Sequence, residues 1–197
     1  MMIRKLLCYG DSNTWGFDPR DGERYPAEGR WPDLLTAEYG IETRNEGLNG
    51  RTIPYGECGF SMARLMLTQT PDCDAALVML GTNDIFWIWE VTAEKIADRL
   101  RGLFANVPGF LRWKGGARRI FLLSPPPLIF PDVPENAAYL RAAAELPAAY
   151  RRVAEESGFG FFDVAAVRPE MAFDGLHLSE AGHRQVAKAL GEYLTRT

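Results

Sequence analysis

The chain has 197 residues, of which 47% are hydrophobic and 24% are charged, and its formal net charge at pH 7 is −4. This composition is typical of a globular protein and argues against a disordered or low-complexity chain. The acidic balance argues against nucleic acid as a partner, because phosphate binding depends on clustered Lys and Arg side chains. No apolar run is long enough to span a bilayer, so we expect no membrane partner.

The start of the chain and its cysteines bear on where the protein resides. The N-terminus enters an apolar segment within three residues and shows no secretory signal. The three cysteines Cys8, Cys58 and Cys73 are odd in number and lack the C-x-x-C spacing, which disfavours a disulfide framework and a zinc site. We therefore expect a cytoplasmic protein, and its length fits a single domain over residues 1–197.

The first half of the chain begins with an apolar strand. Residues 3–9 are a short run rich in aliphatic residues and bounded by a glycine, which is typical of a strand buried on both faces of a sheet. A helix with Pro32 in its first turn is expected over residues 30–40, followed by a weaker strand at 41–48. Residues 75–80 have the same pattern as the first strand. This order is typical of an α/β fold.

The second half continues the alternation. Thr92 is a candidate N-cap of a helix whose apolar face carries Ile96, Leu100, Leu103 and Phe104. Pro147 should kink or split the helical segment that contains it. The elements expected after the Thr92 helix are, in order, a strand at 120–123, that helical segment at 135–157, a weaker strand at 159–164 and a final helix capped by Ser179.

Strands and helices alternate along the whole chain, which predicts a three-layer, flavodoxin-like α/β sandwich with a five-stranded parallel sheet. In such sheets, ligands bind beyond the carboxyl ends of the strands. Polar motifs follow three of the predicted strands at this position. They are Gly10-Asp11-Ser12-Asn13, Asn49-Gly50-Arg51-Thr52 and Gly81-Thr82-Asn83-Asp84. We expect the three motifs to share one crevice.

Ser12 becomes a useful nucleophile only if a base takes its proton. The chain has two histidines, and His177 follows Asp174 at a spacing that lets one loop hold both side chains, with Gly175 permitting a tight turn. His183 falls inside the last predicted helix and is explained more simply by surface exposure or helix packing. The sequence therefore favours Ser12, His177 and Asp174 as a catalytic set.

Acyl transfer to a serine also needs hydrogen-bond donors for the oxyanion of the tetrahedral intermediate. Asn83 offers a side-chain amide, and Ser12 and Gly50 offer backbone N–H groups. Glycine at position 50 leaves room for a substrate to approach the backbone. These three residues are the candidate oxyanion hole.

The ordered blocks that carry these residues, from Gly10-Asp11-Ser12-Asn13 to Asp174-x-x-His177, resemble those of the SGNH, or GDSL-like, hydrolases. The resemblance implies that Ser12 is nucleophile and oxyanion donor, that Gly50 and Asn83 are oxyanion donors, that His177 is the general base and then the acid, and that Asp174 orients it. It implies neither a metal nor a cofactor. Asn13 stands where this family usually has leucine, and we expect this change to lie outside the chemistry.

The blocks are more similar still to small bacterial arylesterases and acyltransferases of that superfamily. This implies a small-molecule ester substrate with an acetyl-type acyl group, and a homo-oligomer, with an octamer as one candidate. Trp15, Phe86 and Trp87 are tentative substrate-binding residues, and the segments 17–29 and 86–89 could form walls or interfaces, with core packing as the alternative for 86–89. Acyl transfer, thioesterase, lysophospholipase and carbohydrate deacetylase activities stay open.

Two readings of other classes compete with a serine esterase. Asp11, Asp84, Asp174 and His177 could be ligands of a metal-dependent phosphoesterase, but a chain with two histidines fits that class poorly, and full activity after dialysis against EDTA would exclude it. A flavodoxin-like binding module without catalysis would leave the serine, asparagine, aspartate and histidine together by chance. The phosphate-binding G-x-G-x-x-G pattern is also missing after the first strand.

Overall fold

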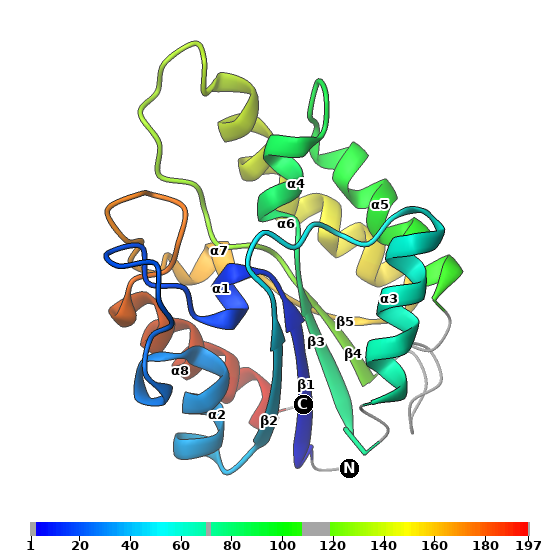
Figure 1. Ribbon diagram of the computed structural model, residues 1–197, viewed down its shortest axis with the longest axis vertical. Coiled ribbons are helices and arrows are strands. Elements are labelled where there is room, and N and C mark those ends of the chain that lie inside the picture. The colour runs from blue at the N-terminus through cyan, green and yellow to red at the C-terminus, as the bar shows by residue number, and fades with distance from the viewer. Residues whose placement is uncertain (1–2, 70–71, 108–118, 197) are drawn as a thin grey trace.

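A five-stranded sheet forms the centre of the computed structural model, which describes residues 3–69, 72–107 and 119–196 (Figure 1). The strand order is β2-β1-β3-β4-β5, and every neighbouring pair is parallel. The strands are β1 (Lys5–Gly10), β2 (Glu42–Gly47), β3 (Ala75–Met79), β4 (Ile120–Leu123) and β5 (Gly160–Phe162). Four of them lie within segments predicted to be strands, β1 extends one residue past its predicted segment 3–9, and the expected α/β fold is confirmed.

Helices cover both faces of the sheet, which gives three layers (Figure 1). On one face, α2 (Trp31–Tyr39) and α8 (Glu180–Arg196) share an apolar core with Leu6 and Cys8 of β1. On the other face, α3 (Gly56–Thr68), α5 (Ala93–Asn106) and α6 (Ala137–Ser157) share a second core with Leu7 and Tyr9. The alternation of β1 side chains between two buried cores explains its uninterrupted apolar sequence.

Three short helices begin directly after strands. They are α1 (Ser12–Trp15) after β1, α4 (Thr82–Trp87) after β3 and α7 (Val164–Val167) after β5, and a 3₁₀ turn at Ala27–Gly29 precedes α2. The strands β2, β1 and β3 are neighbours in the sheet. Each of the three polar motifs predicted to share a crevice follows one of these strands. Because neighbouring parallel strands end at the same edge of the sheet, the motifs lie at that edge on adjacent strands.

The helix ends agree with the capping residues expected from the sequence. Thr92 accepts a hydrogen bond from the N–H of Lys95 at 3.2 Å, and Ser179 accepts one from Gly182 at 3.0 Å. The expected split of the helix at Pro147 is wrong, because α6 runs without a break through that residue. Proline removes a single helical hydrogen bond. The buried face of α6, which includes Tyr150 and Val153, holds the helix together across it.

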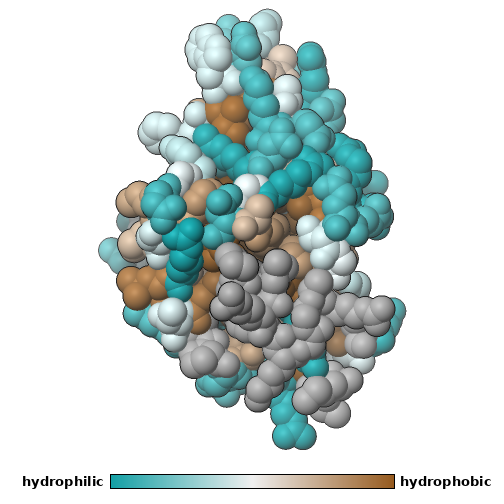
Figure 2. Space-filling view, turned by 90° about the vertical axis from the view of Figure 1, so that its right-hand side faces the viewer, coloured by the Kyte–Doolittle hydropathy of each residue, from teal (hydrophilic) through white to brown (hydrophobic). Residues whose placement is uncertain are grey.

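Helix α3 was not expected from the sequence. Only Ala63 and Leu67 of its 13 residues are buried, whereas Met62 and Leu65 are 64% and 54% exposed. Apolar residues that do not share one face produce no helical pattern. Figure 2 shows the side of the molecule that carries α3 and α5, where hydrophilic residues surround patches of apolar ones. Across the described ranges, no helix combines the length and apolar character needed to cross a membrane.

Candidate active site

Ser12 is the first residue of α1, and only Asp11 separates it from Gly10, the last residue of β1. The Asp11 side chain caps this helix by accepting a hydrogen bond from the N–H of Asn13 at 2.9 Å. The cap forces the chain to turn at once from strand to helix. Ser12 is therefore held at the carboxyl edge of the sheet, where the residue is 6% exposed.

Asp174 and His177 lie in the loop between α7 and α8. One oxygen of Asp174, Oδ1, accepts hydrogen bonds from the N–H groups of Leu176 and His177, both at 3.0 Å. Gly175 has a φ of +65°, and a Cβ atom there would lie 2.1 Å from the carbonyl oxygen of Ile129. The positive φ and the close backbone both require glycine, as the tight turn in the sequence predicted.

The structure brings the three predicted catalytic residues into one chain of contacts. His177 Nε2 lies 3.0 Å from Ser12 Oγ, and His177 Nδ1 lies 2.6 Å from Asp174 Oδ2. Burial would raise the pKa of Asp174, but hydrogen bonds from the His177 ring and from two backbone N–H groups outweigh it and lower that pKa below its usual value. The carboxylate beside the imidazole is thus kept ionised.

Asn83 stands near the start of α4, and its amide nitrogen donates to the carbonyl oxygen of Arg51 at 3.0 Å. Arg51 in turn donates to the carbonyls of Gly10, at 2.8 Å, and Glu46. Its guanidinium also lies over the Tyr9 ring, 4.4 Å from the centroid. These contacts tie the loop after β2 to the ends of β1 and β3.

Gly50 lies exposed in this loop with a φ of +73°. A Cβ atom there would meet no atom within 4 Å. Room for a substrate was the reason expected for glycine at this position. The structure adds a second reason, since the positive φ disfavours any other residue whatever the space around it.

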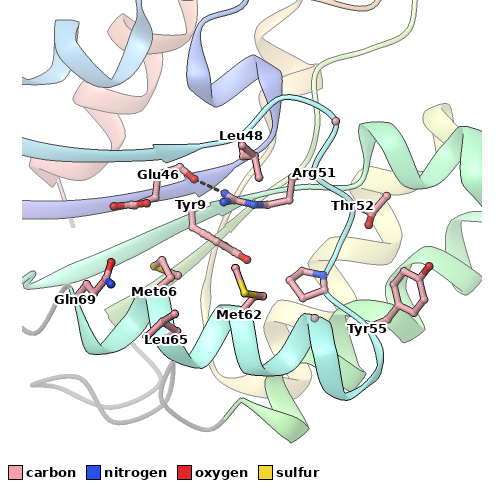
Figure 3. A pocket seen from close by; sticks show the side chains of 13 residues that line it. Tyr9, Glu46, Leu48, Arg51, Thr52, Tyr55, Met62, Leu65, Met66 and Gln69 are labelled. Atoms are coloured by element: carbon pink, nitrogen blue, oxygen red, sulfur yellow. Dashed lines mark hydrogen bonds between the residues drawn. The ribbon is translucent and has the colours of Figure 1, made fainter.

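A hollow of about 480 Å³ opens beyond the Gly50 loop, between α3 and the strands β1 and β2 (Figure 3). Apolar and aromatic side chains of Tyr9, Leu48, Met62 and Leu65 line it together with Arg51. Neither Ser12 nor Asp174 nor His177 is among its lining residues. The hollow therefore borders one candidate oxyanion donor but not the candidate catalytic residues.

An aromatic ring lies beside the imidazole, and a second ring lies beside the first. The Phe17 ring centroid lies 4.6 Å from that of His177, and the Trp15 ring lies 6.4 Å from that of Phe17. Trp15 was a predicted substrate-binding residue, whereas Phe17 was expected only as the start of a wall-forming loop. Phe17 follows a glycine, and nothing in the sequence around it indicates contact with His177, which is distant in the chain.

The other two predicted substrate-binding residues lie in the aromatic run at 86–89. Phe86 is 37% exposed and packs against the rings of Phe130 and Tyr139, with centroids 6.0 and 5.2 Å away. Trp87 and Trp89 are 74% and 83% exposed, so core packing, the alternative reading of this run, is wrong for both. The run lines a hollow of about 420 Å³, which includes neither Ser12 nor His177.

Asn13, which was expected to lie outside the chemistry, contacts the loop that carries His177. Its Oδ1 accepts a hydrogen bond from the N–H of Leu178 at 2.9 Å, and its Nδ2 donates to the carbonyl of Leu176 at 3.3 Å. The two peptide groups flank His177. Asn13 and its partners are more than 160 positions apart in the sequence, and no local pattern could have paired them.

His183 is fully buried, and its Nδ1 accepts a hydrogen bond from the backbone N–H of Trp31 at 3.4 Å. Its ring meets Tyr25 edge-on at 5.5 Å. Burial lowers the pKa of His183 to about 3, so the ring is neutral. Of the two readings of this residue, surface exposure and helix packing, the structure confirms helix packing.

Two buried carboxylates, those of Asp84 and Asp11, lie close to the site. Asp84 is fully buried and accepts hydrogen bonds from Ile53 N–H at 2.9 Å and from the Arg99 guanidinium at 2.8 Å. Asp84 thus forms an ion pair with Arg99 and a hydrogen bond to the loop after β2. Within residues 3–69, 72–107 and 119–196, no three His, Cys, Asp or Glu side chains gather in a way that could hold a metal ion.

The buried carboxylate of Asp11 predicts a pH dependence of stability. Burial raises its pKa from 3.8 to about 7, and the nearby Asp84 adds to this effect. Between these values the folded protein holds a proton that the unfolded chain has lost, so this group stabilises the fold less as the pH rises to 7. Relative to wild type, Asp11→Asn should therefore gain up to about 3 kcal/mol of unfolding free energy between pH 5 and pH 8.

Urea unfolding of both proteins at the two pH values measures this difference. Asp21→Asn is the matched control, because Asp21 also accepts an N–H bond from the residue two positions on but is exposed. Its effect should be equal at pH 5 and pH 8. An Asp11→Asn effect that is equally independent of pH would contradict the expected ionisation.

Comparisons with known proteins agree with this geometry. The sequence profile of the GDSL-like lipase/acylhydrolase family matches residues 8–185, and no curated protein gives a significant match. A carbohydrate acetylesterase family member from Sinorhizobium meliloti is 31% identical with a TM-score of 0.83, over 98% of each chain. The native aryl esterase of M. smegmatis is 29% identical with a TM-score of 0.81, over 98% of this chain and 99% of its own.

A second structure from Sinorhizobium meliloti, a carbohydrate acetylesterase, is 26% identical with a TM-score of 0.78, over 98% of this chain and 99% of its own. These structures match almost the full length of the chain, with the α/β fold described above. The family profile also extends over both loops that carry Ser12 and His177. The chain therefore belongs to the GDSL-like lipase/acylhydrolase family, the SGNH hydrolases.

Proposed function

We propose that the chain is a serine esterase that hydrolyses small carboxylic esters through an acyl-enzyme intermediate. The observation that carries this proposal is the chain of contacts from Ser12 Oγ to His177 Nε2, at 3.0 Å, and from His177 Nδ1 to Asp174 Oδ2, at 2.6 Å. A nucleophile, a base within hydrogen-bond reach and a carboxylate that orients the base are the parts of a catalytic triad.

In the proposed reaction, Ser12 Oγ attacks the ester carbonyl carbon while His177 Nε2 takes its proton. The tetrahedral intermediate collapses, and the alcohol leaves with that proton, so that the acyl group stays on Ser12. Water then attacks the acyl-enzyme with His177 again as base, and the carboxylic acid is released. Asp174 stays ionised throughout and stabilises the imidazolium form of His177, which agrees with its lowered pKa.

The oxyanion of each tetrahedral intermediate would accept hydrogen bonds from the backbone N–H groups of Ser12 and Gly50 and from the Asn83 amide. One N–H of Asn83 holds the carbonyl of Arg51 at 3.0 Å. An amide nitrogen carries two hydrogens, so the second can serve the oxyanion. The bond to Arg51 fixes the amide before a substrate arrives, as electrostatic stabilisation of a transition state requires.

Covalent labelling with a fluorophosphonate tests the proposal, because such a reagent phosphonylates an activated serine. We expect one adduct on Ser12 by peptide mass spectrometry, none in Ser12→Ala and a strongly slowed reaction in His177→Ala. Ser61→Ala is the matched control, since Ser61 is exposed on α3 and should not affect labelling. Labelling at an unchanged rate in Ser12→Ala would refute the proposed nucleophile.

We also propose that the acyl group is short and that the alcohol is an aryl or sugar alcohol. The Phe17 ring lies against His177 and the Trp15 ring lies beside Phe17, and the similar structures include an aryl esterase and a carbohydrate acetylesterase. Phe86 and Trp87 stay tentative parts of this binding surface. A direct comparison of kcat/KM for an aryl acetate and a sugar acetate would distinguish the two alcohols.

A series of p-nitrophenyl esters from acetate to octanoate measures the acyl preference. We expect kcat/KM to be highest for acetate and to fall as the chain lengthens, because the Phe17 ring packs against the imidazole and would hinder a long acyl chain there. A maximum at octanoate would contradict the short acyl pocket. It would favour instead the thioesterase or lysophospholipase reading of this family.

The remaining expectations from the sequence stay predictions: a single domain over residues 1–197, a cytoplasmic location, acyl transfer beside hydrolysis and a homo-oligomer with an octamer as one candidate. The exposed side chains of Trp87 and Trp89 support an interface at the end of α4.

A further inference from the structure

Asn13 contacts the loop that carries His177 on both sides of that residue. Its Oδ1 accepts the N–H of Leu178 at 2.9 Å, and its Nδ2 donates to the carbonyl of Leu176 at 3.3 Å. Asn13 is the direct neighbour of Ser12 in the chain. One side chain thus links the backbone next to the candidate nucleophile with the backbone on either side of the candidate base.

Asn13 is itself held firmly. Its backbone N–H donates to Asp11 at 2.9 Å, and its carbonyl accepts a hydrogen bond from the indole N–H of the fully buried Trp31 at 2.9 Å. Asn13 as a whole is 1% exposed. In such a site water cannot replace a lost partner, and a hydrogen bond is costly to lose. Displacement of the His177 loop would therefore break bonds that nothing else compensates.

Asn13 and Asp174 constrain the His177 loop in different ways. Asp174 holds the N–H groups of Leu176 and His177 and contacts the imidazole Nδ1, all within the same loop. It therefore orients the ring relative to the loop. Asp174 does not determine where that loop stands relative to α1. Asn13 supplies this second constraint, because its amide joins α1 to the loop.

We infer that Asn13 is a positioning residue that sets the distance and angle between Ser12 Oγ and His177 Nε2. This inference rests on the proposed esterase function. Proton transfer depends on the 3.0 Å separation of those two atoms. A leucine at position 13 would offer neither a donor nor an acceptor to the His177 loop.

The first test is a comparison of Asn13→Leu with wild type. We expect kcat to fall about 10- to 100-fold, the size of effect that a displacement of about 1 Å produces, with KM within about twofold. If the loss acts through His177, Asn13→Leu should cost nothing further in a His177→Ala background. A full additional loss in that background would overturn the inference, as would wild-type kcat in folded Asn13→Leu.

The second test observes the imidazole directly and does not depend on turnover. The chain has two histidines, so the Nδ1 proton of His177 can be assigned in ¹H–¹⁵N spectra by its absence in His177→Ala. We expect this proton to be protected from exchange in wild type and to exchange at least tenfold faster in Asn13→Leu, because a loop released from α1 admits water to the imidazole and to its bond with Asp174. An unchanged rate would overturn the inference.

Asn45→Leu is the matched control for both tests. Asn45 also makes two hydrogen bonds through its side chain, to the Thr14 carbonyl of α1 at 2.8 Å and to the N–H of Gly47 at 2.9 Å, but it does not contact the His177 loop. We expect its substitution to lower stability and to leave the His177 proton protected. Equal exchange in both variants would mean that loosening of α1 alone explains the effect, which overturns the inference.

Asn13→Asp covers the case in which the leucine variant does not fold. It keeps the side-chain volume and the acceptor for Leu178 but turns an oxygen toward the carbonyl of Leu176, so kcat should again fall. Wild-type kcat and exchange in Asn13→Asp would overturn the inference. Fast exchange in Asn13→Leu together with full esterase activity of Ser12→Ala would support positioning by Asn13 and refute only the proposed function.

Discussion

Replacement of Ser12 by alanine is expected to lower the hydrolysis of p-nitrophenyl acetate by about 10⁶-fold, the size of effect known for loss of a serine nucleophile. The hydroxyl of Ser12 contacts the imidazole of His177 at 3.0 Å, and the helix that begins there is capped by Asp11 rather than by Ser12. The variant should therefore keep the fold while it loses the reaction.

Circular dichroism and thermal melting of Ser12→Ala should match those of wild type, and Ser61→Ala should keep full activity as an exposed control. His177→Ala should be nearly as inactive, and the double variant Ser12→Ala/His177→Ala should be no slower than either single one. The reason is that a nucleophile and its base act as a unit. Purified Ser12→Ala that hydrolyses the ester within tenfold of wild type would refute the proposed mechanism.

The sheet could be predicted from the sequence because its strands are buried on both faces. β1 alternates Leu6 and Cys8 toward one core with Leu7 and Tyr9 toward the other, and this leaves an apolar run that few other structures explain. Helix α3 could not be predicted from the sequence, because much of its apolar surface is exposed rather than buried. Pro147 misled the prediction of α6 because burial of one helix face outweighs a single missing hydrogen bond.

The candidate catalytic residues could be predicted because each lies in a short motif at a strand end or a turn. Ser12 follows β1 directly, and Asp174 stands three positions before His177. Asn13 and Phe17 could not be found in this way. Their places beside His177 arise from the packing of α1 and the loop after it against a segment near the end of the chain.

The surface near α4 could be predicted only in part. The sequence left the aromatic run at 86–89 open between core packing and a wall or interface, because periodicity cannot separate these roles in four residues. The structure places Trp87 and Trp89 on the outside while Ile88 packs against the core. Exposed aromatic residues of this size usually indicate a binding surface.

Substitution of Asp174 by asparagine is expected to leave the fold intact and to slow hydrolysis by about 10⁴-fold, as in better-studied triads. The contacts of Asp174 explain the direction. Oδ1 accepts two N–H groups, so the amide oxygen of an asparagine must take this place, because its NH₂ group would meet two donors there. The NH₂ group then faces His177 Nδ1, which lies 2.6 Å from Oδ2 in wild type.

A donor at that position forces Nδ1 to accept and places the imidazole proton on Nε2, where it points toward Ser12 Oγ and cannot receive the serine proton. The stability should change little, because both backbone hydrogen bonds remain. Kinetics and urea unfolding measure the two effects, and ¹H–¹⁵N spectra of the imidazole report the tautomer. Asp21→Asn, at an exposed turn, should alter none of them. An Asp174→Asn enzyme within tenfold of wild type would mean that the carboxylate does not select the tautomer of His177.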